Sequence, residues 1–195
     1  MARVEERDRS DLPDRLRQLW DDFTQPDSDF TNQVRVVAHS PAAFTHLYGL
    51  VQSLKSESAL PSRLIEVAVV TASRVNQCPY CVAHHGATLI RNGLSQQTVD
   101  DILEAEVPGL DEREHAVRDY ARYVTERAWG IHDAMFARLR QHFDDKTIVE
   151  LTVRICLTGL FNKFNQALEV DIEQALDDEA EARAGNARSV EDAVQ

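Results

Sequence analysis

Residues 61–93 read PSRLIEVAVVTASRVNQCPYCVAHHGATLIRNG, and this stretch decides the fold. Proline suits the first turn of a helix, where its missing N–H costs nothing, so Pro61 and Pro79 each mark a helix start. The segment after Pro61 is nearly all apolar, which predicts a central, buried helix. Gly93 gives a C-terminal stop for the helix that Pro79 opens. The stretch therefore predicts two helices that form an antiparallel hairpin about Asn76–Gln77.

Helical periodicity continues on both sides of this hairpin. Ser40 and Pro41 give a cap and a first turn for one more helix, and Asp111 begins a long amphipathic one. Further helices are predicted from Ser95, over 133–143, and from Asp144 or Asp145. The sequence thus predicts an all-α fold. Its expected organisation is a charged, partly helical extension over 1–30, one helical domain over 31–172, and a polar tail or terminal helix over 173–195.

The composition disfavours several classes of protein. The 195 residues include only 7 Gly and 6 Pro, which argues against turn-rich β folds and disordered linkers. A net charge of −12 argues against a nucleic-acid partner, because surfaces that bind phosphates are basic. No apolar run approaches the roughly 18 residues of a membrane span, and the N-terminus has no signal-peptide pattern. Three cysteines are too few for a secreted disulfide scaffold, so we expect a soluble cytoplasmic protein.

Two apolar segments match at an offset of 84 residues: LIEVAV at 64–69 and IVELTV at 148–153. The same offset aligns Cys78 with Asn162 and Cys81 with Asn165. An internal helical-hairpin repeat, in which only the first copy kept its thiols, gives this pattern. Chance similarity between two apolar helices gives it equally well, so both explanations stay open.

The tetrapeptide Cys78-Pro79-Tyr80-Cys81 is the strongest chemical signal in the chain. Residues three apart in a first helical turn lie on one face, where two sulfurs can close into a disulfide. A thiol at a helix N-terminus also lies at the positive end of the helix dipole, which favours the thiolate and lowers the pKa. The alternative, two buried cysteines with a purely structural role, is disfavoured because Pro79 fixes a helix start at this point. The tetrapeptide therefore indicates redox or metal chemistry.

Helical geometry distinguishes the two histidines that follow. Successive side chains are rotated by about 100° around the helix axis. His85 therefore points within about 20° of the direction of Cys78, whereas the direction of His84 differs from it by about 120°. His85 also follows Cys81 by four residues, the spacing of neighbours on one helix face. We therefore expect His85 to face the thiols and His84 to belong to another surface.

Glu66 lies inside the apolar helix that Pro61 opens. An ionised carboxylate there is costly unless it is paired and hydrogen-bonded. In an antiparallel hairpin Glu66 comes back alongside the second helix, within reach of His85. Glu, His and Cys arranged in this way can move protons to and from a thiol. The alternative is a carboxylate at the helix edge, exposed to water.

Glu66, Cys78, Cys81 and His85 follow one another at spacings of 12, 3 and 4 residues. This pattern resembles the active-site motif of the alkyl hydroperoxidase D-like (AhpD-like) proteins in the carboxymuconolactone decarboxylase superfamily. The segment Leu151–Val170, with Phe161-Asn162-Lys163-Phe164, resembles the closing helix of the peroxidase-related members. The likeness therefore covers residues 40–172. One position departs from the pattern, because Tyr80 lies between the cysteines where the type enzyme has a histidine.

The resemblance implies an all-helical homo-oligomer with antioxidant peroxidase activity that needs no haem, metal or other cofactor. It implies that Cys81 is the thiolate that attacks the hydroperoxide and that Cys78 resolves the sulfenic acid to a disulfide. It assigns Glu66 and His85 to the proton relay. The implied reductant is a dithiol, supplied by a lipoyl domain, a thioredoxin-like protein or a small thiol. Lactone decarboxylation is disfavoured, since decarboxylase members generally lack the cysteine pair.

Other interpretations compete with this one. Cys-Pro-Tyr-Cys is also the glutaredoxin tetrapeptide, but that fold needs a strand before the motif and alternating strands and helices after it. A zinc site at Cys78, Cys81, His85 and Glu66 has chemically suitable ligands. A c-type haem is excluded, because Val82 rather than histidine follows the second cysteine. A redox-sensing interaction module would use the same disulfide without sustained turnover.

Three residues outside the motif are expected to pack. Cys156 lies among Ile155, Leu157 and Leu160, which predicts a small buried apolar side chain. Trp20 and Trp129 are likewise interpreted as packing residues.

Overall fold

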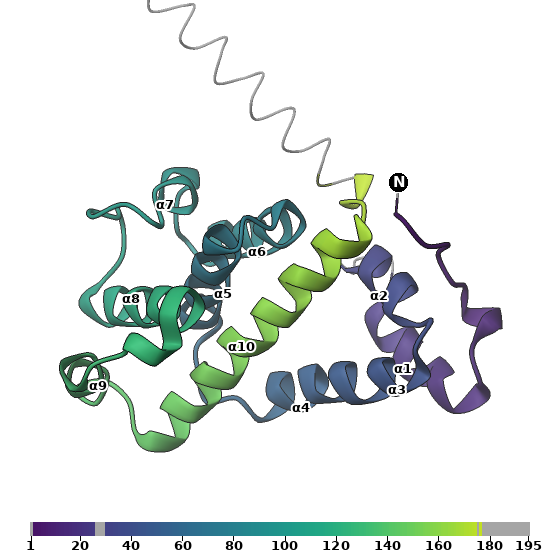
Figure 1. Ribbon diagram of the computed structural model, residues 1–195, viewed down its shortest axis with the longest axis horizontal. Coiled ribbons are helices and arrows are strands. Elements are labelled where there is room, and N and C mark those ends of the chain that lie inside the picture. Colours follow the sequence, from purple (N-terminus) through teal and green to yellow (C-terminus); the bar gives the residue numbers. More distant parts are fainter. Residues whose placement is uncertain (1, 26–29, 175, 177–195) are drawn as a thin grey trace, which may run out of the picture. The chain divides into compact units, whose positions relative to one another are not determined.

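The computed structural model describes residues 2–25, 30–174 and 176, and every regular element in these ranges is a helix (Figure 1). The predicted all-α class is therefore confirmed. The chain divides into two compact units: one is Val51–Ala167, and the other combines Met1–Leu50 with Leu168–Gln195, so far as these are described. No described helix is long and apolar enough to cross a membrane. Most of the tail predicted over 173–195 lies outside the described residues.

The larger unit is organised around α5 (Ser62–Val75), which packs against both α6 (Pro79–Arg91) and α8 (Glu112–Arg127). Its other helices are the end of α4 (Gly49–Glu57), α7 (Gln96–Asp100), α9 (Asp133–Leu139) and nearly all of α10 (Asp145–Leu168). The core side chains are mostly aliphatic and come from most of these helices and from the turn after α7; they include Leu64, Val67, Val70, Leu89, Ile102, Val117, Leu139, Leu151 and Ile155. The apolar helix predicted after Pro61 is thus the centre of the unit.

Local capping explains where these helices begin. The Cys78 sulfur caps α6 by accepting a hydrogen bond from the backbone N–H of Cys81. Ser95 and Asp111 cap α7 and α8 with their side-chain oxygens, and both form capping boxes. Gly93, at φ +90°, takes the left-handed conformation that ends α6. The predicted helix starts are confirmed. They could be predicted because each start depends on residues within one turn of it.

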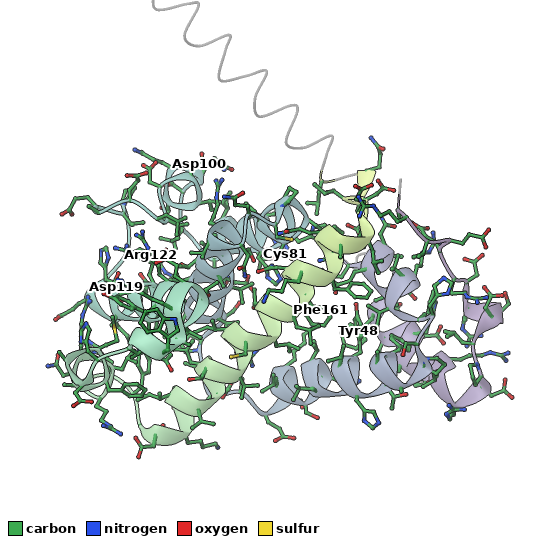
Figure 2. The ribbon with its side chains drawn as sticks, in the orientation of Figure 1. Tyr48, Cys81, Asp100, Asp119, Arg122 and Phe161 are labelled. Atoms are coloured by element: carbon green, nitrogen blue, oxygen red, sulfur yellow. The ribbon has the colours of Figure 1, made fainter. Side chains whose placement is uncertain are left out.

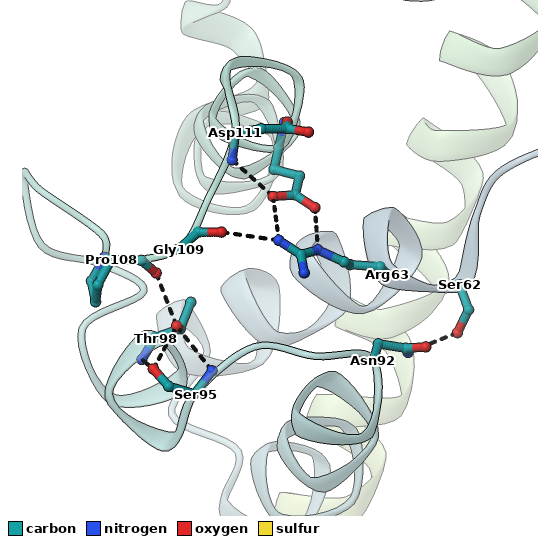
Figure 3. A network of polar contacts seen from close by, with 9 residues as sticks. Ser62, Arg63, Asn92, Ser95, Thr98, Pro108, Gly109 and Asp111 are labelled. Atoms are coloured by element: carbon teal, nitrogen blue, oxygen red, sulfur yellow. Dashed lines mark hydrogen bonds and ion pairs between the residues drawn. The ribbon is translucent and has the colours of Figure 1, made fainter.

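Arg63 joins the start of α5 to the start of α8 (Figure 3). Its guanidinium donates to both carboxylate oxygens of Glu114, and also to the carbonyl oxygen of Gly109 at 2.9 Å. The Glu114 carboxylate also accepts from the backbone N–H of Asp111 at 2.9 Å. The Glu114 side chain is only 4 % exposed. This one buried carboxylate therefore pairs with the Arg63 guanidinium and also accepts the hydrogen bond from the N-cap residue of α8.

The smaller unit contains α1 (Asp14–Phe23), α2 (Thr31–Val37), α3 (Pro41–Ala43), the π-helical turn η2 (Phe44–Tyr48) and the beginning of α4. Aromatic rings fill its interior: the centroid of Tyr48 lies 4.8 Å from that of Phe23 and 5.1 Å from that of Phe44. Trp20 is buried beside Phe44, as expected of a packing residue. The sequence analysis predicted one regular helix from Pro41 to Leu54, whereas the π turn interrupts it.

Two packing predictions are wrong. Cys156 is exposed, and Trp129, in the 3-10 turn after α8, is 90 % exposed. α10 buries the face that carries Ile155 and Thr158, while Val153, Cys156 and Leu160 lie on the opposite side. Because α10 is apolar on both faces, its sequence does not indicate which face meets the core.

Candidate active site

The candidate site is centred on two buried sulfurs at the N-terminus of α6. Cys78 precedes Pro79, and the first helical turn brings its Sγ to 3.0 Å from the Sγ of Cys81. Both are free cysteines in this structure, so the geometry described here is that of the dithiol. Figure 2 labels Cys81 beside the ribbon of α10. The predicted geometry, two sulfurs close enough to join, is present.

The two thiols differ in acidity. The pKa of Cys78 is lowered from an ordinary 9.0 to about 7, chiefly by the hydrogen bond with the Cys81 thiol. Burial opposes this effect, and the backbone N–H of Cys81 and the amides of Asn162 and Gln166 support it. The pKa of Cys81 is raised by the hydrogen bond with Cys78, by burial and by the negative charge on Cys78. The dithiol therefore carries its first negative charge on Cys78.

Glu66 and His85 form a second pair, built by the α5–α6 hairpin. Nδ1 of His85 lies 2.8 Å from Oε2 of Glu66, and their side chains are 25 % and 12 % exposed. The predicted partner of Glu66 is therefore His85, and the contact between them is observed. The carboxylate fixes the orientation of the imidazole and favours the tautomer that carries its proton on Nδ1. The spacing of four residues places His85 one turn beyond Cys81.

His84 belongs to the interior instead. It is fully buried, its ring stacks on Tyr80 with centroids 4.2 Å apart, and Nδ1–H donates to the Tyr80 carbonyl oxygen at 2.9 Å. Burial lowers its pKa to about 3, with the neighbouring charges of His85 and Arg91 acting in the same direction. His84 is therefore neutral at physiological pH. Tyr80, the residue between the cysteines, is thus a packing partner of this imidazole.

α10 contributes buried amides that the sequence analysis did not assign to the site. Nδ2 of Asn165 donates to the Sγ of Cys81 at 3.3 Å. Nδ2 of Asn162 donates to Oγ of Ser73 at 3.1 Å, and its Oδ1 accepts from Asn76 at 2.9 Å. Both side chains are at most 2 % exposed. The only signal in the sequence was the offset of 84 residues, which aligned these asparagines with the cysteines without predicting contact.

The two copies in that alignment differ in structure. The first turns at Asn76–Gln77, where Gln77 has a φ of +55°, and Pro79 then starts α6. The second runs through Asn162 and Asn165 as one unbroken helix, α10. The hydrogen bond between Asn165 and Cys81 thus joins two positions that the offset aligns, although only the first copy forms a hairpin.

The donor arrangement does not support the zinc alternative. Within the described ranges, no three His, Cys, Asp or Glu side chains converge closely enough to hold a metal ion. Glu66 and His85 are bonded to each other, and the two sulfurs form a separate contact. The four residues therefore form two pairs instead of one tetrahedral cage.

The fold and this site define an all-helical protein with a buried dithiol at a helix N-terminus. The family model of the carboxymuconolactone decarboxylase family matches residues 40–123. An AhpD-type protein of unknown function from Agrobacterium tumefaciens is 30 % identical, with a TM-score of 0.65 over 71 % of this chain and 95 % of its own. The chain therefore belongs to the carboxymuconolactone decarboxylase family, as an AhpD-like member.

Two other solved structures share the fold. An uncharacterised peroxidase-related protein with an alkylhydroperoxidase AhpD core, from Ralstonia eutropha JMP134, is 26 % identical; its TM-score is 0.77 over 90 % of this chain and 94 % of its own. The debrominase Bmp8 is 18 % identical, with a TM-score of 0.69 over 90 % of this chain and 93 % of its own. No curated protein matches the chain. The fold thus occurs both in an uncharacterised peroxidase-related protein and in a debrominase.

Proposed function

We propose that this protein is a thiol-dependent hydroperoxide reductase that cycles between a Cys78–Cys81 dithiol and disulfide. The observation that carries the proposal is the 3.0 Å contact between two buried sulfurs at the start of α6. A second support is the depressed pKa of Cys78, since a thiol with a pKa of about 7 is half ionised at neutral pH. The peroxidase-related neighbour is consistent with this assignment.

The oxidative half-reaction has two steps. Because the resting negative charge lies on Cys78, a proton must first pass from Cys81 to Cys78 across their contact, against the order of their pKa values. The Cys81 thiolate then attacks the outer oxygen of the hydroperoxide. The O–O bond breaks, an alcohol leaves with the proton of Cys78, and Cys81 becomes a sulfenic acid. The Cys78 thiolate next attacks the Cys81 sulfur, the S–O bond breaks, and the disulfide forms. The hydroxide that leaves takes a proton from solvent through the His85 imidazole and becomes water. These roles follow the resemblance to the AhpD-like motif.

Glu66 and His85 supply the proton relay in this proposal. The carboxylate fixes the tautomer of the imidazole by accepting from Nδ1, as the 2.8 Å contact allows. Nε2 then takes and returns protons at the thiol pair. The imidazole is 25 % exposed, so in this proposal it can exchange protons with solvent.

The reductive half-reaction needs an external dithiol. A thiolate of the reductant attacks one sulfur of the disulfide, and its second thiol then releases the reductant as a disulfide. We propose a lipoyl domain or a thioredoxin-like protein as the source, with dithiothreitol as the laboratory substitute. The two electrons that reduce the peroxide come from this donor.

Steady-state consumption of an organic hydroperoxide with excess dithiothreitol tests the proposal. We expect the wild type to turn over many times, Cys81→Ser to be inactive, and Cys78→Ser to form one sulfenic acid without closing a disulfide. Mass spectrometry after substoichiometric peroxide should find Cys78 linked to Cys81. A protein that is oxidised once and never cycles would be a redox sensor, and single variants as active as the wild type would refute the assignment.

A further inference from the structure

Three amides of α10, those of Asn162, Asn165 and Gln166, act on the reacting sulfurs, and Asn165 is the one that donates directly to Cys81. Its Nδ2 donates to the Sγ of Cys81 at 3.3 Å, and the residue is 2 % exposed. It lies nine positions after Cys156 on the same helix; Cys156 is exposed, whereas Asn165 is on the buried face. α10 thereby places a neutral N–H donor against a sulfur that α6 presents.

Cys81 needs such a donor more than Cys78 does. The sulfur of Cys78 accepts from the backbone N–H of Cys81 at the helix N-terminus. The Cys81 sulfur lies further into the same turn, is buried, and faces the charge that forms on Cys78. A side-chain amide does not titrate near neutrality, so its N–H can donate to a thiolate throughout the working pH range.

We propose that Asn165 is a further catalytic residue, which stabilises the Cys81 sulfur as an anion by donating a hydrogen bond from Nδ2. The inference rests on the proposed function, because it assigns this contact to the steps in which Cys81 carries negative charge. The first is the attack of the Cys81 thiolate on the hydroperoxide.

The second step is reduction of the disulfide. The reductant thiolate forms a bond to the Cys78 sulfur, the S–S bond breaks, and its electron pair leaves with Cys81 as a thiolate. Leaving is faster when the departing thiolate is stabilised. One amide thus assists Cys81 as nucleophile in one half-reaction and as leaving group in the other.

Asn162, one turn earlier on the same face, also lowers the pKa of Cys81 and of Cys78, so it cannot serve as a control. Its Nδ2 donates to Ser73 and its Oδ1 accepts from Asn76, so both ends of the amide are engaged with α5 and the turn that follows it. Thr158 is the better control for the loss of a polar group. Its hydroxyl lies on the same buried face and donates to the carbonyl oxygen of Arg154 within α10.

The test measures the ionisation of Cys81 alone, in full-length protein that carries Cys78→Ser and Cys156→Ser. The thiolate absorbance is followed against pH with Asn165 intact, with Asn165→Leu, and with Thr158→Val as the matched control. We expect Asn165→Leu to move the titration upward by about one pH unit, a tenfold loss of thiolate on the rising limb. Thr158→Val should leave it in place.

An unchanged titration in Asn165→Leu would overturn the inference, and so would equal shifts in both variants. If Asn165→Leu does not fold, Asn165→Ala is held to the same two criteria. With both active cysteines present, Asn165→Leu should also slow reduction of the disulfide by dithiothreitol at least threefold. Because neither measurement uses peroxide, both can succeed or fail independently of the peroxidase assay.

Discussion

The acidity of Cys78 should depend mainly on its neighbour, so replacing Cys81 by alanine tests the electrostatics of the site. Lowering a pKa from 9.0 to about 7 corresponds to about 3 kcal/mol of preference for the thiolate. The hydrogen bond with Cys81 is the largest cause, whereas the backbone N–H of residue 81 and the amides of Asn162 and Gln166 survive the substitution. We therefore expect the pKa of Cys78 to rise by at least one unit in Cys81→Ala.

The assay is the thiolate absorbance of the reduced protein as a function of pH, because it does not require a reagent to reach a buried sulfur. Cys156→Ser is introduced in every sample, so that the exposed thiol does not contribute. At pH 7 the thiolate fraction of Cys78 should fall from about half to less than about a tenth. A midpoint that stays near pH 7 in Cys81→Ala would refute the reasoning. It would show that the helix N-terminus and the amides are sufficient.

Three further outcomes are expected. Glu66→Gln, which removes the charge that orients His85, should lower peroxide turnover roughly a hundredfold, and unchanged turnover would exclude Glu66 from the relay. Glu114→Gln breaks the buried contact with Arg63 and should cost about 2 kcal/mol of unfolding free energy in urea; a loss no larger than that of exposed Glu112→Gln would contradict this. The folded pKa of His84 is depressed to about 3, below the unfolded 6.5, so its contribution to stability is present above pH 6.5 and is lost as the pH falls toward 3. The slope should be about 1.4 kcal/mol per pH unit in urea unfolding, and His84→Gln should remove it; an unchanged slope would show that another group is responsible.

Much of the helical organisation could be predicted, because the signals are local. A proline in the first turn and an oxygen or sulfur at the cap act within three residues, so Pro79, Ser95 and Asp111 mark helix starts correctly. The π turn at Phe44–Tyr48 has no such signal. It lies where Phe44 and Tyr48 pack against each other and against the aromatic rings of α1.

The candidate site was predictable in part for the same reason. Cys78, Cys81 and His85 lie on one helix, where spacing fixes which side chains share a face. Glu66 needed one additional assumption, the antiparallel hairpin, and its contact with His85 follows from that. Asn165 lies 84 residues from Cys81, and no local rule relates the two positions.

The all-α class, the cysteine pair at a helix start, and the need of Glu66 for a partner all follow from the amino-acid sequence alone. These depend on covalent spacing and on the energetic cost of a buried charge. Only the tertiary structure decided which face of α10 is buried, and hence that Asn165 contacts Cys81 while Cys156 is exposed. Both faces of that helix are apolar, so the packing of α10 against the other helices makes the choice.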